Sequence, residues 1–183
     1  MASGRAVLAA IGLLVTAGAG LAMPAASAVQ AASAGLCELA RFRVSIGPEV
    51  SEETQQHTLV LRLTNRSGTA CVLDGYPAIA LYDRRGQIPF PIRHHDQMIA
   101  DRQPRRLLIR NGAPAYVVLN KNVCVLGVTA GSRITSRIRI GAASITFDLR
   151  SNPHADVPEY CGKGFGRTLA VSPFVGTVGQ ALG

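Results

Sequence analysis

Aromatic residues are scarce in this chain of 183 residues, at 5% of the total, and no nucleic-acid recognition motif accompanies them. Proteins that read a nucleic-acid sequence usually stack bases on aromatic rings or present a recognisable binding motif. Sequence-specific binding of nucleic acid is therefore not expected.

Long apolar runs are also absent, except near the N-terminus. There, residues 6–22 form an apolar run that is short, rich in small residues and preceded by Arg5. Two small-x-small sites follow it. The pattern predicts a signal peptide over residues 1–34, cleaved after Ala28 or Ala34. A retained N-terminal anchor is the alternative.

The remainder, residues 35–183, has the length of one domain with a single core. It contains no C-x-x-C pair, the usual start of a zinc or thiol-redox site. An even number of cysteines in an exported chain indicates two disulfides instead. Leu36 argues against lipid attachment at the first cysteine, because lipoprotein signals place a small residue there. The four cysteines are Cys37, Cys71, Cys124 and Cys161.

No segment shows a convincing helical period, whereas apolar residues alternate with polar ones throughout. Residues 58–64, for example, are predicted to bury Leu59, Leu61 and Leu63 and to expose Val60. Turn residues separate the alternating segments. The pattern predicts an all-β fold, a two-layer antiparallel sandwich of about eight or nine strands. The expected strands lie within residues 41–46, 58–64, 78–82, 88–92, 106–109, 115–119, 132–140, 144–150 and 168–174.

The spacing of the cysteines suggests how they pair. If residues 41–46 pair antiparallel with 58–65, the centre of that pair falls near the midpoint of Cys37 and Cys71. A hairpin over residues 133–150 is likewise centred on the midpoint of Cys124 and Cys161. Sequence alone permits three pairings. This symmetry predicts Cys37–Cys71 and Cys124–Cys161.

The stretch LRLTNRSGTACVLDGYPAIALYDRRG, residues 61–86, resembles the signature of an exported bacterial family catalogued as domain of unknown function 4232. The resemblance covers nearly all of residues 35–183 and includes the placement of the other cysteines. The matching positions are Thr64, Asn65, Cys71, Leu73, Gly75, Tyr76, Pro77, Asp83 and Gly86.

One position departs from the family pattern. Family members usually have a Pro-Gly turn before the strand expected at residues 115–119, whereas this chain has Asn111-Gly112. An Asn-Gly turn serves the same geometry, because both residues tolerate a positive φ. The resemblance implies an exported immunoglobulin-like sandwich with two disulfides and of unassigned activity.

His94, His95 and Asp96 form the best metal-like cluster in the sequence. Adjacent histidines on an extended chain point to opposite sides, so a shared ion would need a further ligand from elsewhere. A solvated loop is the other interpretation. No serine lies in a nucleophile-elbow motif. The sequence therefore indicates no cofactor and favours a protein that is not an enzyme.

Arginine dominates the positive charge, because Lys121 and Lys163 are the only lysines among 19 basic residues and the formal net charge is +8. Arginine binds phosphate and carboxylate with its planar fork. If the two groups of arginines lie together, they form an anion-binding patch. A solvated outer face is the alternative. The candidates are Arg93, Arg102, Arg105, Arg106 and Arg110 in the long connection and Arg133, Arg137 and Arg139, expected on one face of a single strand.

These observations predict a secreted or cell-envelope-associated domain that binds or scaffolds without catalysis. Its expected partner is an anionic envelope polymer, contacted through arginines, or another envelope protein. The alternative is an extracytoplasmic hydrolase or metal-dependent enzyme that uses the loop of His94, His95 and Asp96. A purely structural envelope protein with no specific ligand is a third possibility.

Overall fold

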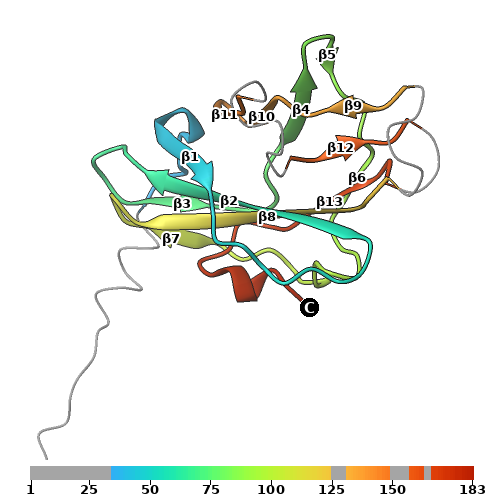
Figure 1. Ribbon diagram of the computed structural model, residues 1–183. Helices are drawn as coiled ribbons and strands as arrows, with labels where there is room; N and C mark the ends of the chain where they lie inside the picture. The colour runs from blue at the N-terminus through green and yellow to red at the C-terminus, as the bar shows by residue number, and fades with distance from the viewer. Residues whose placement is uncertain (1–33, 125–130, 149–156, 163–165) are drawn as a thin grey trace, which may run out of the picture.

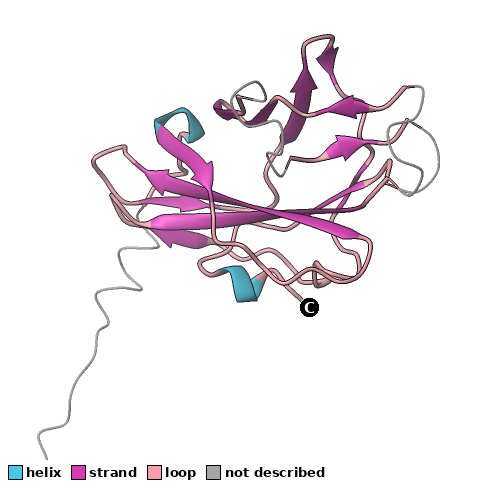
Figure 2. Ribbon diagram, in the orientation of Figure 1, coloured by secondary structure: helices cyan, strands magenta, loops and turns pink. Residues whose placement is uncertain are grey.

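The computed structural model describes residues 34–124, 131–148, 157–162 and 166–183, which form an all-β protein (Figure 1). The predicted signal peptide lies outside the described residues except for Ala34. Within them, the only helices are two 3-10 turns, η1 (Leu39–Arg41) and η2 (Val178–Gln180) (Figure 2). Neither turn has the length or the apolar surface needed to cross a membrane, and no other described segment is helical.

The largest sheet has five strands in the order β1-β2-β8-β13-β6. Its centre is the long antiparallel pair of β2 and β8, in register from Gln56↔Asn122 to Thr64↔Pro114. The predicted pairing of residues 41–46 with 58–65 is confirmed, because β1 pairs antiparallel with β2. The strands are β1 (Phe42–Ile46), β2 (Gln56–Asn65), β6 (Ile92–Arg93), β8 (Pro114–Asn122) and β13 (Leu169–Val171).

A second sheet has four strands in the order β11-β10-β4-β5, and two small two-stranded sheets complete the fold. The predicted hairpin is confirmed, because β10 and β11 pair across the turn at Gly141. The remaining strands are β3 (Cys71–Leu73), β4 (Ile79–Asp83), β5 (Gly86–Gln87), β7 (Leu107–Ile109), β9 (Arg133–Ile134), β10 (Arg137–Ile140), β11 (Ala143–Thr146) and β12 (Glu159–Tyr160).

The prediction of one continuous strand through residues 133–140 is wrong. The chain breaks into β9 and β10 because Thr135 turns inward, where its backbone N–H and its hydroxyl both donate to the carbonyl oxygen of Pro158. Thr135 is fully buried, whereas Ile134, predicted to face inward, is 47% exposed. A local hydrogen bond thus overrides the apolar alternation.

The main core lies between the five-stranded and four-stranded sheets. Leu59, Leu61 and Leu63 project from β2 into the same hydrophobic cluster as Ile138 and Ile140 of β10. This is the face of β2 that the alternation predicts to be buried. The four-stranded sheet therefore covers one side of the β2–β8 pair.

The opposite face of the β2–β8 pair is covered too, so the predicted exposure of Val60 is wrong. Val60 and Val118 form a second hydrophobic cluster with Ile99, Val175 and Ala181. These last three come from the long connection and the C-terminal segment, which run beneath the sheet in Figure 1. The predicted exposure of Thr58 and Thr64 is also wrong, and in the central part of β2 only Arg62 is exposed.

Both predicted disulfides are present. Cys37 is bonded to Cys71 and Cys124 to Cys161, with Cα–Cα distances of 4.9 Å and 5.4 Å. Cys37 comes just before η1 and β1, and Cys71 begins β3, shortly after β2 ends. The first bond therefore ties together the two chain segments that flank the β1–β2 pair. Disulfides persist in oxidising compartments, and two of them fit a protein that folds outside the cytoplasm.

Candidate functional site

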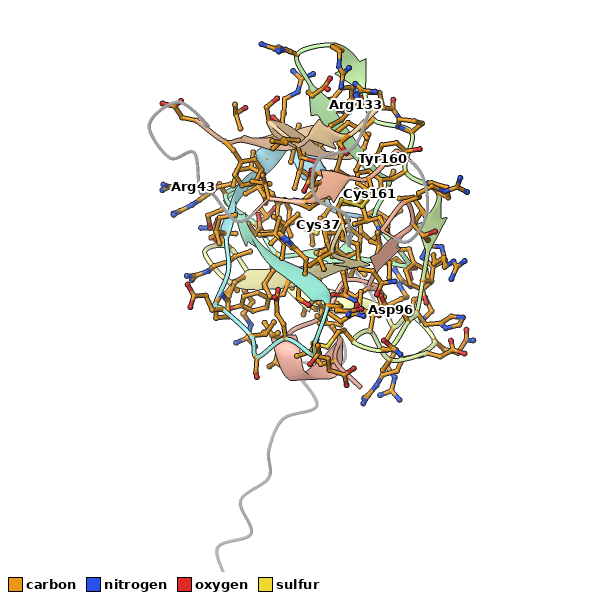
Figure 3. The ribbon with its side chains drawn as sticks, turned by 45° about the vertical axis from the view of Figure 1, so that its right-hand side comes forward. Cys37, Arg43, Asp96, Arg133, Tyr160 and Cys161 are labelled. Carbon is orange, nitrogen blue, oxygen red and sulfur yellow. A yellow bond between two sulfur atoms is a disulfide. The ribbon has the colours of Figure 1, made fainter. Side chains whose placement is uncertain are left out.

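The two groups of arginines lie on opposite sides of the five-stranded sheet. Arg137 and Arg139 belong to β10, which covers the face of Leu61, whereas the long connection covers the face of Val60. Figure 3 shows the same separation, with Arg133 and Asp96 at opposite ends of the molecule. A single patch built from both groups is therefore excluded by the fold.

Arg133 is fully engaged with its own chain. Its Nε and Nη2 donate to the Asp83 carboxylate at 2.7 Å and 2.5 Å, and its remaining donors bond the carbonyl oxygens of Gly86 and Gln87. The side chain is only 15% exposed. The hydrogen bond from Arg133 holds the pKa of Asp83 far below its usual range, although burial opposes this shift. The same bond raises the pKa of Arg133. Arg133 stabilises the β4–β5 turn, and an external anion would have to displace Asp83.

Arg137 and Arg139 remain on the outer face of β10, where both are exposed. The guanidinium of Arg137 lies 4.6 Å from the centroid of the Tyr82 ring, a cation–π distance. Together they place two positive charges on the four-stranded sheet. Among the described residues, no cavity of notable size is lined by either side chain.

Three arginines of the other group do share a cavity. Arg102, Arg105 and Arg106 line a groove of about 520 Å³ whose opposite side comes from the C-terminal segment. Leu107, Phe174 and Val175 supply its apolar lining. Only Arg106 has an acidic neighbour, Asp74, at 3.7 Å and with both side chains well exposed. A groove with a cationic rim and an apolar floor suits an extended ligand that carries negative charge.

The family-like Gly75-Tyr76 step holds both sides of this groove. The Tyr76 hydroxyl donates to the backbone oxygen of Arg102 at 3.1 Å, and the Phe174 N–H donates to the backbone oxygen of Gly75 at 3.3 Å. Gly75 has φ +76°, a left-handed conformation that glycine adopts without strain. The motif therefore positions the groove rather than lining it.

His94, His95 and Asp96 do not converge on one centre. The His94 ring stacks on Tyr76 with centroids 3.7 Å apart. The Asp96 carboxylate accepts hydrogen bonds from the backbone N–H groups of Met98 and Ile99 and from the Asn120 amide. His95 lines a different cavity. Across the described ranges, no group of three or more histidine, cysteine or acidic side chains is arranged to hold a metal ion.

The remaining candidates lie elsewhere. Arg110 is exposed in the turn after β7 and lines neither cavity, whereas Arg93 of β6 lines the second cavity with His95. Sequence reasoning missed the C-terminal residues that form the far side of the groove. The only signal for them is the apolar pair Phe174-Val175 after the last predicted strand.

The comparisons with known proteins agree with the sequence signature. A family model described as "Domain of unknown function (DUF4232)" matches residues 37–174, a range that includes all four cysteines and most of the groove. No curated protein and no solved structure matches the chain.

Proposed function

The chain belongs to the DUF4232 family, and from that premise we propose that it is a secreted or envelope-associated binding protein rather than an enzyme. Its proposed ligand is an anionic polymer of the cell envelope, held in the groove of Arg102, Arg105 and Arg106. One observation carries the proposal: three arginines line a single groove and only one of them has a carboxylate nearby. Proteins that fold outside the cytoplasm meet such polymers directly.

The charge of the groove supports a polymer over a small neutral molecule. Exposed arginines attract anions over distances of about 10 Å at moderate salt. A chain with repeated negative charges can contact Arg102, Arg105 and Arg106 in turn, while the apolar lining excludes water from the contact. Binding of this kind weakens as salt rises, because each contact competes with ions in solution.

The proposal is tested with a double variant, Arg102→Gln and Arg105→Gln, which removes two charges from the groove. The matched control, Arg137→Gln and Arg139→Gln, removes two charges from the opposite side of the sheet. The probes are polyphosphate and poly-L-glutamate of equal length, and the measurement is the dissociation constant at low and moderate salt. We expect the groove variant to bind at least roughly tenfold more weakly and the control to lose less than about threefold.

Equal losses in both variants would show that net charge, and not the groove, governs binding. Absence of salt-sensitive binding by the unmodified protein would also overturn the proposal. Preference for one probe decides whether phosphate or carboxylate is the recognised group.

The finer fold assignment is part of the same proposal. We propose that the five-stranded and four-stranded sheets form an immunoglobulin-like sandwich over residues 35–183, supported by the core that they share. A solution structure with the strand order of an immunoglobulin domain would establish it.

The alternative enzyme reading requires His94, His95 and Asp96 to act together. The stacking of His94 on Tyr76 and the three hydrogen bonds to Asp96 favour a structural role for two of them. Metal analysis of the purified protein, with stability measured in the presence and absence of chelator, tests the metal form of that alternative.

A further inference from the structure

A second cavity, of about 580 Å³, lies at the polar end of the face that Val60 and Val118 share. We propose that it is a separate binding site for a singly charged carboxylate group. It is lined by four carboxamide side chains, together with Arg93, His95 and Asp96. The carboxamides are those of Gln55, Gln56, Gln97 and Asn122.

A buried network fixes the orientation of these amides. Gln56 is only 7% exposed, and its Nε2 donates to Oε1 of Gln97 at 3.1 Å and to Oδ1 of Asn122 at 2.6 Å. Its own oxygen accepts a bond from the fully buried Asn120. Both donors and the acceptor of the Gln56 side chain are therefore occupied within the protein.

This orientation leaves donors in the cavity. Because Gln97 and Asn122 use their oxygens to accept from Gln56, their NH₂ groups occupy the other branch of each planar amide. Within the described residues, neither NH₂ group donates a hydrogen bond, and Arg93 has no acidic partner. The cavity thus offers two amide donors and one guanidinium, a set that matches a ligand rich in acceptor oxygens.

The backbone at the rim is also specialised. Gln55 has φ +66° and is the one described residue other than glycine with a positive φ. Its carbonyl oxygen accepts a hydrogen bond from the N–H of Val123, which holds this uncommon conformation. Such conformations persist where the surrounding structure maintains them, and they are frequent at binding sites.

The charge of the lining selects among acceptor-rich ligands. Arg93 contributes one positive charge and Asp96 one negative charge, and the Asp96 oxygens already accept three hydrogen bonds. A phosphate monoester carries about two negative charges at neutral pH. The single guanidinium therefore suits a carboxylate better than a phosphate.

The test uses ¹⁵N-labelled protein and follows the side-chain NH₂ signals of Gln97 and Asn122 by NMR. The probes are sodium glucuronate, glucose and inorganic phosphate at equal ionic strength. We expect glucuronate to shift both signals saturably, phosphate to bind more weakly and glucose to cause no shift. Glucose shifting the same signals, phosphate binding more tightly, or no saturable shift with glucuronate would each overturn the proposal.

Variants locate the site. Arg93→Gln should weaken glucuronate binding roughly tenfold, the usual cost of losing a charge-assisted hydrogen bond. Gln97→Glu should weaken it by at least as much, because the new carboxylate still accepts from Gln56 but replaces the outward donor with negative charge. The control Arg110→Gln should change affinity less than roughly twofold, since Arg110 lines neither cavity.

Equal losses in Arg93→Gln and Arg110→Gln would show that only net charge matters. The double variant Arg102→Gln and Arg105→Gln should leave the glucuronate response intact. Loss of the response in that variant would mean that this cavity is not an independent site. The outcome therefore separates failure of this site from failure of the arginine groove.

Discussion

The two faces of the β2–β8 pair are both buried, but in different ways. Leu61 and its neighbours on one face pack against the regular strands of the four-stranded sheet. Val60 on the other face packs against Ile99, Val175 and Ala181, which belong to the irregular connection and the C-terminal segment. One face is covered by a second sheet and the other by segments outside the named strands.

The difference explains where the candidate sites lie. A sheet that packs on a sheet fills the space between them with side chains. Irregular segments cover the Val60 face only in part, and their edges leave the arginine groove and the carboxamide cavity. Binding residues tend to lie on loops held by a rigid scaffold. The face with the looser cover is therefore the one that carries the proposed functions.

The largest expected effect is on the Leu61 face. Leu61 is fully buried, and Leu61→Ala should lower the free energy of unfolding by about 4 kcal/mol, since it removes buried methyl groups and leaves a cavity. Urea unfolding measures the change. A loss below about 1 kcal/mol would contradict the tightly packed core described for this face.

The polar end of the opposite face should be the next most sensitive. Asn120 is fully buried and bonds the side chains of Thr58, Gln56 and Asp96. Asn120→Ala leaves all three without this partner and should cost about 3 kcal/mol in the same unfolding experiment. Asn122→Ala is a suitable comparison, because it removes one bond to Gln56 and should cost about 1 kcal/mol. Equal costs for the two variants would argue against the buried network.

Val60→Ala tests whether the irregular cover behaves as a core. Val60 is 2% exposed, and loss of two buried methyl groups should cost about 2 kcal/mol. Arg62→Ala changes the exposed residue two positions further along the same face and should cost less than about 0.5 kcal/mol. If both variants cost equally little, the C-terminal segment does not cover this face in solution.

The smallest effect concerns Lys121, at the end of the Leu61 face. Burial lowers the pKa of Lys121 from 10.5 to about 8, and Glu159 only partly opposes this shift. The unfolded chain therefore binds more protons than the folded one between these two values, so stability rises as the pH increases through that window. Relative to Lys121→Met, the unmodified protein should gain about 1.5 kcal/mol between pH 8 and pH 9.5. Parallel stability curves for the two proteins would show that Lys121 is not buried as a cation.

Much of the fold could be predicted from local pattern. The alternation at Leu59, Leu61 and Leu63 identified the inner face of β2, and the spacing of Cys37 and Cys71 identified their disulfide. The prediction failed at Ile134, where the hydrogen bonds of Thr135 to Pro158 reverse the inward and outward sides. Alternation reports hydrophobicity alone, and it cannot anticipate a buried polar contact with a segment that is distant in sequence.

The candidate sites were only partly predictable. The sequence identified Arg102, Arg105 and Arg106 as candidates, but it grouped them with Arg133, whose partner Asp83 lies far away along the chain. The amides of Gln97 and Asn122 gave no signal, because each is an ordinary polar residue until Gln56 fixes its orientation.

The sequence by itself determined the all-β class, the buried face of Leu61, the two disulfides and the family. These features depend on residues that are close in the chain or repeat with the period of a strand. Only the tertiary structure decided that the Val60 face is covered, that the arginine groups lie apart and that two cavities flank the cover. Those outcomes depend on irregular segments, whose positions are set by packing and hydrogen bonds between distant residues and leave no periodic trace in the sequence.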